Sequence, residues 1–156
     1  MKPKPLIPDA YGPKLSPPTA TFSIMLRSTP RSARLAWLLV AERLTDWGVP
    51  RRTDCFNIAV LIVAELAGNA VRHCADAGWD FSVQVTMHPA PSDAATSTLR
   101  IESPTPVPTD HCGATPRRPP DCESGRGLSL VEALTPHWGC VARDAGTKSV
   151  WAEATL

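Results

Sequence analysis

Two polar residues, Glu65 and Asn69, lie four positions apart in an otherwise apolar stretch of the chain. In a helix this spacing puts both side chains on one face, about 40° apart, and Arg72 falls almost over Glu65. Burying a carboxylate and an amide is costly unless they meet a ligand, an ion or each other. A carboxylate can hold a substrate proton and an amide oxygen can bind Mg²⁺, so the pair fits a magnesium–nucleotide site. An ion pair between Glu65 and Arg72 or His73 on the helix surface is the alternative.

Two glycine-containing segments follow later in the chain. Glu123-Ser-Gly125-Arg126-Gly127-Leu128 joins a long loop to an apolar segment with helical spacing. Glycines let the backbone approach a ligand closely, and a helix N-terminus offers unpaired N–H groups to phosphate. The segment therefore fits a phosphate cradle, with a flexible helix start as the alternative. In Gly146-Thr147, a hairpin turn is the ordinary interpretation, although the Thr147 hydroxyl could also reach a nucleotide pocket.

The segments that would position these residues follow the hydrophobic periodicity. Helical spacing predicts helices over 30–47 and 54–74, and a third helix that starts near Gly127. Thr29-Pro30 is typical of a helix start, and Gly48 of a helix end. Alternation of apolar and polar residues predicts strands over 21–27, 81–87, 97–102, 138–143 and 149–154. The order β-α-α-β-β-loop-α-β-β predicts an α+β two-layer sandwich with a mixed, mostly antiparallel sheet and helices on one face.

The composition fits one globular domain preceded by a tail. A chain of 156 residues that is 43% hydrophobic can bury a sizeable core. Six of the seventeen prolines fall in residues 1–20 and six more between Pro104 and Pro120, and we expect neither block to form regular helix or central strand. The first block is predicted to be a mobile tail before a domain spanning 21–156, and residues 104–123 a lid loop.

Charge, cysteine content and hydropathy narrow the function class. A net charge of +1 gives no overall attraction to nucleic acid or to an anionic membrane. We expect no membrane span, because no apolar run reaches the roughly 18 residues that one requires, and no secretory signal at the N-terminus. Five cysteines without a close pairing pattern predict reduced thiols and a cytoplasmic protein, and their spacing argues against a zinc site.

The motifs, taken together and in this order, resemble the GHKL superfamily of ATP-binding domains, which includes histidine kinases and gyrase B. The resemblance covers about residues 21–155 and is carried by Glu65-Leu-Ala-Gly-Asn-Ala-Val-Arg-His73, Gly125-Arg-Gly-Leu-Ser-Leu-Val131 and Thr147-Lys-Ser-Val-Trp-Ala-Glu153. Within the superfamily, the chain is similar to the anti-sigma-factor serine/threonine kinases of bacterial partner-switching systems. The resemblance implies the Bergerat-type ATP-binding fold.

The resemblance also implies a role for each motif residue. Asn69 would ligate Mg²⁺ that bridges the phosphates of ATP, and Glu65 would act as the general base or position the attacking hydroxyl. Arg72 and His73 would lie one turn further on, past the phosphates. Phosphate would be held by backbone groups of four residues, Gly125, Arg126, Gly127 and Leu128. The Thr147 hydroxyl would lie near the adenine side of the pocket.

One motif departs from the family pattern. The family places an aspartate on the adenine amino group, and Ser103 occupies that position here, in the stretch Ile101-Glu-Ser-Pro-Thr-Pro106. A neutral hydroxyl contact is weaker than a charge-assisted one by about 1 kcal/mol or more. Two functions follow as expectations. The first is an ATP-dependent kinase that phosphorylates an anti-anti-sigma (STAS-type) protein and sequesters a sigma factor, with a possible homodimer. The second is a degenerate, non-catalytic GHKL module that regulates transcription by protein binding alone.

Overall fold

The fold consists of three helices and five strands in the residues that the computed structural model describes, which are 15–75, 78–92, 95–106, 125–135, 137–142 and 147–156. The predicted tail, up to residue 14, and most of the predicted lid, 107–123, lie outside the described residues. The elements, in chain order, are β1 (Ala20–Leu26), α1 (Pro30–Asp46), α2 (Asp54–Cys74), β2 (Phe81–His88), β3 (Thr98–Pro106), α3 (Gly125–Leu134), β4 (Trp138–Ala142) and β5 (Thr147–Thr155).

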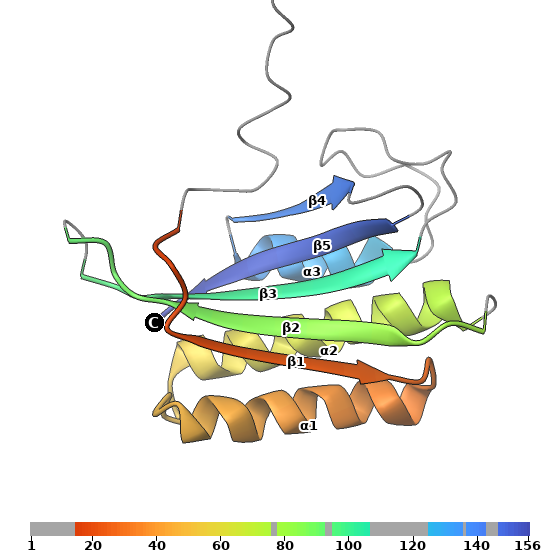
Figure 1. Ribbon diagram of the computed structural model, residues 1–156, viewed down its shortest axis with the longest axis horizontal. Coiled ribbons are helices and arrows are strands. Elements are labelled where there is room, and N and C mark those ends of the chain that lie inside the picture. The colour runs from red at the N-terminus through yellow and green to blue at the C-terminus, as the bar shows by residue number, and fades with distance from the viewer. Residues whose placement is uncertain (1–14, 76–77, 93–94, 107–124, 136, 143–146) are drawn as a thin grey trace, which may run out of the picture.

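The strands form one sheet in the order β1-β2-β3-β5-β4, with the helices on one of its faces (Figure 1). The predicted α+β class is therefore confirmed, and the architecture is consistent with two layers. Every neighbouring pair of described strands is antiparallel, so the expectation of a mixed sheet is wrong. The reason is topological. The hairpin of α1 and α2 returns the chain to the end of the sheet where β1 stopped, and β5 separates β3 from β4.

Local sequence fixes the ends of the two long helices. The Thr29 hydroxyl caps α1 by accepting a hydrogen bond from the Ser32 N–H at 3.1 Å, and Thr53 caps α2 through the Phe56 N–H at 3.3 Å. After α1, Gly48 has a φ of +83°, a left-handed conformation that favours glycine. These caps explain why α2 matches the predicted range and α1 ends within one residue of it.

The core lies between α2 and the sheet. In β2, Phe81, Val83 and Val85 are buried and alternate with part-buried polar residues, so one face of the strand packs on the helices. The face of α2 that meets the sheet supplies Ile62, Val63 and other apolar residues. By length and composition α2 also passes as a membrane-spanning helix, contrary to the expectation that no apolar run is long enough for one. Its packing against α1, α3 and the sheet is that of the core helix of a globular domain.

The strand β3 is longer than predicted, because residues 103–106 extend it beyond residue 102 into the expected lid. The expectation of a lid loop that starts at residue 104 is thus wrong for Pro104 and Pro106. Pairing with β2 ends at Glu102, opposite Gln84, and beyond that point β3 pairs only with β5. The prolines therefore fall where the strand has become a local edge, and an edge tolerates a residue without an N–H.

Candidate functional site

The predicted catalytic face of α2 contains a buried amide. Asn69 is 5% exposed, and no hydrogen bond joins its side chain to any described residue. Glu65, one turn earlier, is part-buried and makes no ion pair with a residue that the structure describes. Buried side-chain amides nearly always have partners, and an unpaired one costs about 1–3 kcal/mol. The arrangement leaves the Asn69 carboxamide available to a ligand or a metal ion.

The alternative for this face was a surface ion pair. Arg72 and His73 are both exposed in the last turn of α2. No ion pair joins either of them to Glu65, although all three residues belong to the described part of α2. The ion-pair interpretation of the Glu65 spacing therefore finds no support in the geometry.

The fold gathers the predicted site segments at one end of the sheet, on the right of Figure 1. Pro106, the last residue of β3, pairs with Thr147, the first residue of β5. The end of α2 lies here as well, because it leads into the start of β2, which is antiparallel to β3. The opposite end is marked by Thr135, which follows α3 and donates to the Glu153 carbonyl near the end of β5.

The third helix begins at Gly125 rather than near Gly127, so residues 125–128 of the predicted phosphate cradle lie within its first turn. Glu123 and Ser124 lie outside the described residues. The first N–H groups of a helix have no intrahelical acceptor and carry a partial positive charge. Gly125, Arg126, Gly127 and Leu128 supply those groups here. Their side chains, and that of Thr147, lie outside the described part of the structure. Since α3 packs beside α2, these amides belong to the helix next to Asn69.

Ser103, the predicted adenine contact, is held by the sheet. Its side chain is on the helix-facing side and only 1% exposed, and its hydroxyl donates to the Ser82 carbonyl at 2.8 Å. The bond forms just where β2 and β3 stop pairing, and the next residue, Pro104, has no N–H to offer β2. The hydroxyl proton is therefore used within the sheet, and only the oxygen lone pairs could meet a ligand.

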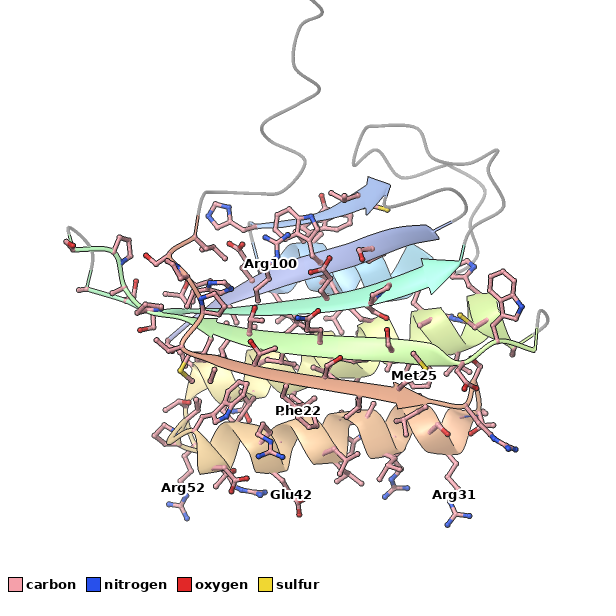
Figure 2. All side chains as sticks on the ribbon, viewed as in Figure 1. Phe22, Met25, Arg31, Glu42, Arg52 and Arg100 are labelled. Carbon is pink, nitrogen blue, oxygen red and sulfur yellow. The ribbon has the colours of Figure 1, made fainter. Side chains whose placement is uncertain are left out.

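A second polar cluster lies on the face of the sheet turned away from the helices, and the sequence analysis missed it. Arg100 of β3 pairs with Glu153 of β5, with 3.0 Å between Nη1 and Oε1. The two side chains are only 12% and 4% exposed. The Arg100 guanidinium also stacks on the Trp151 ring, 4.2 Å from its centroid. Figure 2 shows Arg100 in front of the strands, on the face opposite the helices.

Burial dominates the electrostatics of this cluster. It raises the pKa of the Glu153 carboxyl above 4.5, because loss of hydration outweighs the attraction of Arg100, His137 and His88. The Trp151 ring leaves little space beside it. A Cβ added to Gly139 on the neighbouring strand would lie 3.0 Å from the ring carbon Cζ2. Close packing and a matched charge make this cluster a rigid part of the sheet.

The strand patterns contain a signal for this second cluster. Arg100 and Glu102 alternate with Leu99 and Ile101, and Trp151 and Glu153 alternate with apolar residues of β5. Alternation shows that the polar residues share a face of their own strand. It does not show that β3 and β5 are neighbours, because α3 and β4 lie between these two strands in the chain order. The missing information is the strand order.

An apolar cleft lies at the other end of the molecule from Asn69. It has a volume of ≈ 320 Å³ and an almost wholly apolar wall that includes Trp47, Val49, Met87 and Leu156. A cleft with so little polar surface offers nothing to hold a triphosphate. It is distinct from the segments that gather around the start of α3.

Comparisons with known proteins assign no family. No protein-family model matches the chain, and no curated protein matches its sequence significantly. The functional argument therefore rests on the residues of this chain.

Proposed function

We propose that the chain is an ATP-binding regulatory protein of the GHKL type, with the Bergerat-type fold, similar to an anti-sigma-factor serine/threonine kinase. The observation that carries the proposal is the buried Asn69 amide, which has no hydrogen-bond partner among the described residues. It lies on α2, the helix that packs against α3. An amide oxygen on one helix and unpaired backbone N–H groups at the start of its neighbour suit a magnesium ion and the phosphates that it binds.

The residues divide the work as the resemblance implies. The Asn69 amide oxygen would hold Mg²⁺, which neutralises phosphate charge when bound. The backbone N–H groups of 125–128 would hold phosphate oxygens and keep them in line with the acceptor. The Glu65 carboxylate, part-buried and unpaired in the described structure, would accept the proton of the attacking serine or threonine hydroxyl. Thr147 would approach the nucleotide from the start of β5.

The biological setting follows from the same resemblance. The phosphoryl acceptor would be an anti-anti-sigma protein of the STAS type. The phosphorylation state of that protein would decide whether this chain sequesters a sigma factor. A cytoplasmic location and a homodimer belong to the proposal. Neither nucleic acid nor a membrane is a proposed partner.

A second function has its own supporting observation. The Ser103 hydroxyl is buried and held by the Ser82 carbonyl, so the adenine end of the site lacks the family's aspartate and offers the adenine amino group only a neutral, buried acceptor. This favours a non-catalytic GHKL module that acts by protein binding and holds ATP weakly or not at all.

A thermal-shift titration with Mg-ATP separates the two functions. If ATP binds, a ligand concentration 100 times Kd stabilises the fold by about 2.7 kcal/mol. We expect this shift in the wild-type chain and in Asn57→Ala, a matched control at an exposed asparagine of the same helix. We expect its loss in Asn69→Ala. No shift at millimolar Mg-ATP in the wild type would overturn the kinase and leave the binding module.

A further inference from the structure

A row of polar side chains crosses the open face of the sheet. Thr86 of β2 pairs with Arg100 of β3, and Arg100 pairs with Glu153 of β5, so the three residues lie side by side on one face. Contacts link the row: the Thr86 hydroxyl lies 3.5 Å from the Arg100 carbonyl, and the Arg100 guanidinium pairs with Glu153 at 3.0 Å. The row ends at β2 next to His88, which is 9% exposed although it lies on the open face.

The segment before β1 is tied to this row. Residues 15–19 pass from the start of β1 across the open face, in front of the neighbouring strands (Figure 1). The Ser16 carbonyl lies 2.6 Å from His88 Nδ1. The Thr19 N–H donates to the Met87 carbonyl at 2.8 Å, and the Thr19 hydroxyl reaches the same oxygen at 3.3 Å. We call residues 15–19 the strap.

The partners of His88 determine where its proton must be. A carbonyl oxygen only accepts hydrogen bonds, so Nδ1 must carry a proton when the strap is closed. His88 Nε2 lies 2.9 Å from the Thr86 hydroxyl, which can donate or accept. In neutral His88 the hydroxyl donates to Nε2. In charged His88, Nε2 donates to Thr86, and the hydroxyl proton turns to the Arg100 carbonyl. The closed strap is therefore compatible with both charge states and excludes only the neutral Nε2–H tautomer.

We propose that the strap is a detachable latch over the open face of the sheet, and that His88 is the residue that locks it. Three features support a unit that opens separately from the core. Pro17, Pro18 and Thr19 are exposed, hydrogen bonds among the described residues hold the strap at two points of β2, and proline at two of its five positions removes N–H groups that could bond elsewhere. Opening uncovers His88 and gives water or a partner access to the edge of the Thr86–Arg100–Glu153 row. This inference does not depend on the proposed nucleotide site.

Charged groups of the polar row act on His88 in opposite directions. The carboxylate of Glu153 attracts a charged His88, whereas Arg100 repels it, and His137 is a further titratable group near Glu153. Because both protonation states keep the Ser16 bond, the lock does not open when His88 gains a proton. The latch would therefore be opened by a molecule that accepts a hydrogen bond from His88 Nδ1–H in place of the Ser16 carbonyl, or by one that binds the strap.

Two substitutions at one position test the lock. The amide nitrogen of asparagine matches the place of Nδ1 in histidine, whereas that of glutamine matches Nε2. His88→Asn keeps a donor for the Ser16 carbonyl, and His88→Gln removes it. We expect hydrogen exchange of the Thr19 amide to speed up several-fold to about tenfold in His88→Gln and to stay near the wild-type rate in His88→Asn. Exchange of the Val83 amide, in the buried part of β2, reports the stability of the whole domain and should not change.

Side-chain nitrogen NMR of the wild-type chain gives an independent reading. We expect neutral His88 to show the Nδ1–H tautomer above its titration. A neutral Nε2–H tautomer would overturn the lock. Equal acceleration of Thr19 and Val83 in His88→Gln would also overturn it, because the strap would then open only with the domain. Thr19 exchange that is the same in His88→Gln and His88→Asn would show that the Nδ1 donor does not hold the strap.

Discussion

Asn69 and Glu153 are each 5% exposed, yet one has no partner among the described residues and the other is fully engaged. Glu153 faces Arg100 across a strand pair, and its backbone N–H and carbonyl bond to His137 and Thr135. Asn69 lies in α2, a helix whose backbone is already satisfied and which packs against α3. Since burial is equal, the pairing distinguishes the two residues. Glu153 is a structural polar group, whereas the Asn69 amide is available to a ligand.

The contrast has a simple origin in local structure. A strand places a neighbour directly opposite each residue, so a charge such as Glu153 can find a cross-strand partner. A helix offers its side chains partners only three or four positions away. Asn69 has Glu65 and Arg72 at those positions, and neither is hydrogen-bonded to it. The helix leaves the amide unpaired, and the sheet pairs its carboxylate.

The largest expected effect comes from breaking the paired side of the contrast. Arg100→Met would leave Glu153 buried without its cation and would remove the stacking on Trp151. Loss of one partner of a buried pair costs about 3–5 kcal/mol in the free energy of unfolding, measured by urea denaturation.

A double variant separates the pair from its packing. Arg100→Met with Glu153→Leu replaces both charges by apolar groups, and we expect it to recover most of the lost stability. A cost below about 1 kcal/mol for Arg100→Met would instead fit a solvent-screened surface pair and would remove the contrast with Asn69.

The sequence predicts the helices of this fold better than its strands. Capping by Thr53, an apolar stripe and the absence of internal proline determine α2, and its predicted range of 54–74 is the observed one. Pro104 and Pro106 argued against an extended β3, because a strand tolerates them only where the pairing of β2 with β3 has stopped, beyond the Gln84–Glu102 pair. That pairing is a property of the sheet and cannot be inferred from the strand itself.

The candidate site shows the same limit. The spacing of Glu65 and Asn69 predicts a shared face, but only the packed fold shows that Asn69 is buried and unpaired while Arg72 is exposed. The Arg100–Glu153 pair could not be found at all without the strand order, since 53 residues separate its members. Roles that depend on a ligand stay predictions from the motif.

A smaller effect is expected from the unpaired side of the contrast. Asn69→Leu exchanges an unsatisfied amide for an apolar group of similar size, so the chain without ligand should lose no stability and gain up to about 1 kcal/mol. Urea denaturation without nucleotide measures this change, and Asn57→Leu at an exposed site of the same helix is the control. A loss of 2 kcal/mol or more, on the order expected for a core hydrogen bond and its packing, would show that Asn69 has a structural partner.

The smallest effect is on the pH dependence of stability, and it applies to Glu153 alone. Burial raises the pKa of this carboxyl above 4.5, so the folded chain holds the proton more tightly than the unfolded chain does. The stability that this group contributes is therefore fully present below the unfolded pKa and is lost as the pH rises through the raised folded value. Urea midpoints between about pH 4 and pH 7 should show that decline in the wild type, and Glu153→Gln should flatten it. Asn69→Leu should leave the slope unchanged, because an amide does not titrate. An equal slope in wild type and Glu153→Gln would contradict this prediction. It would mean that the attraction of Arg100 fully offsets the effect of burial on the pKa of Glu153, so that folding leaves that pKa unchanged.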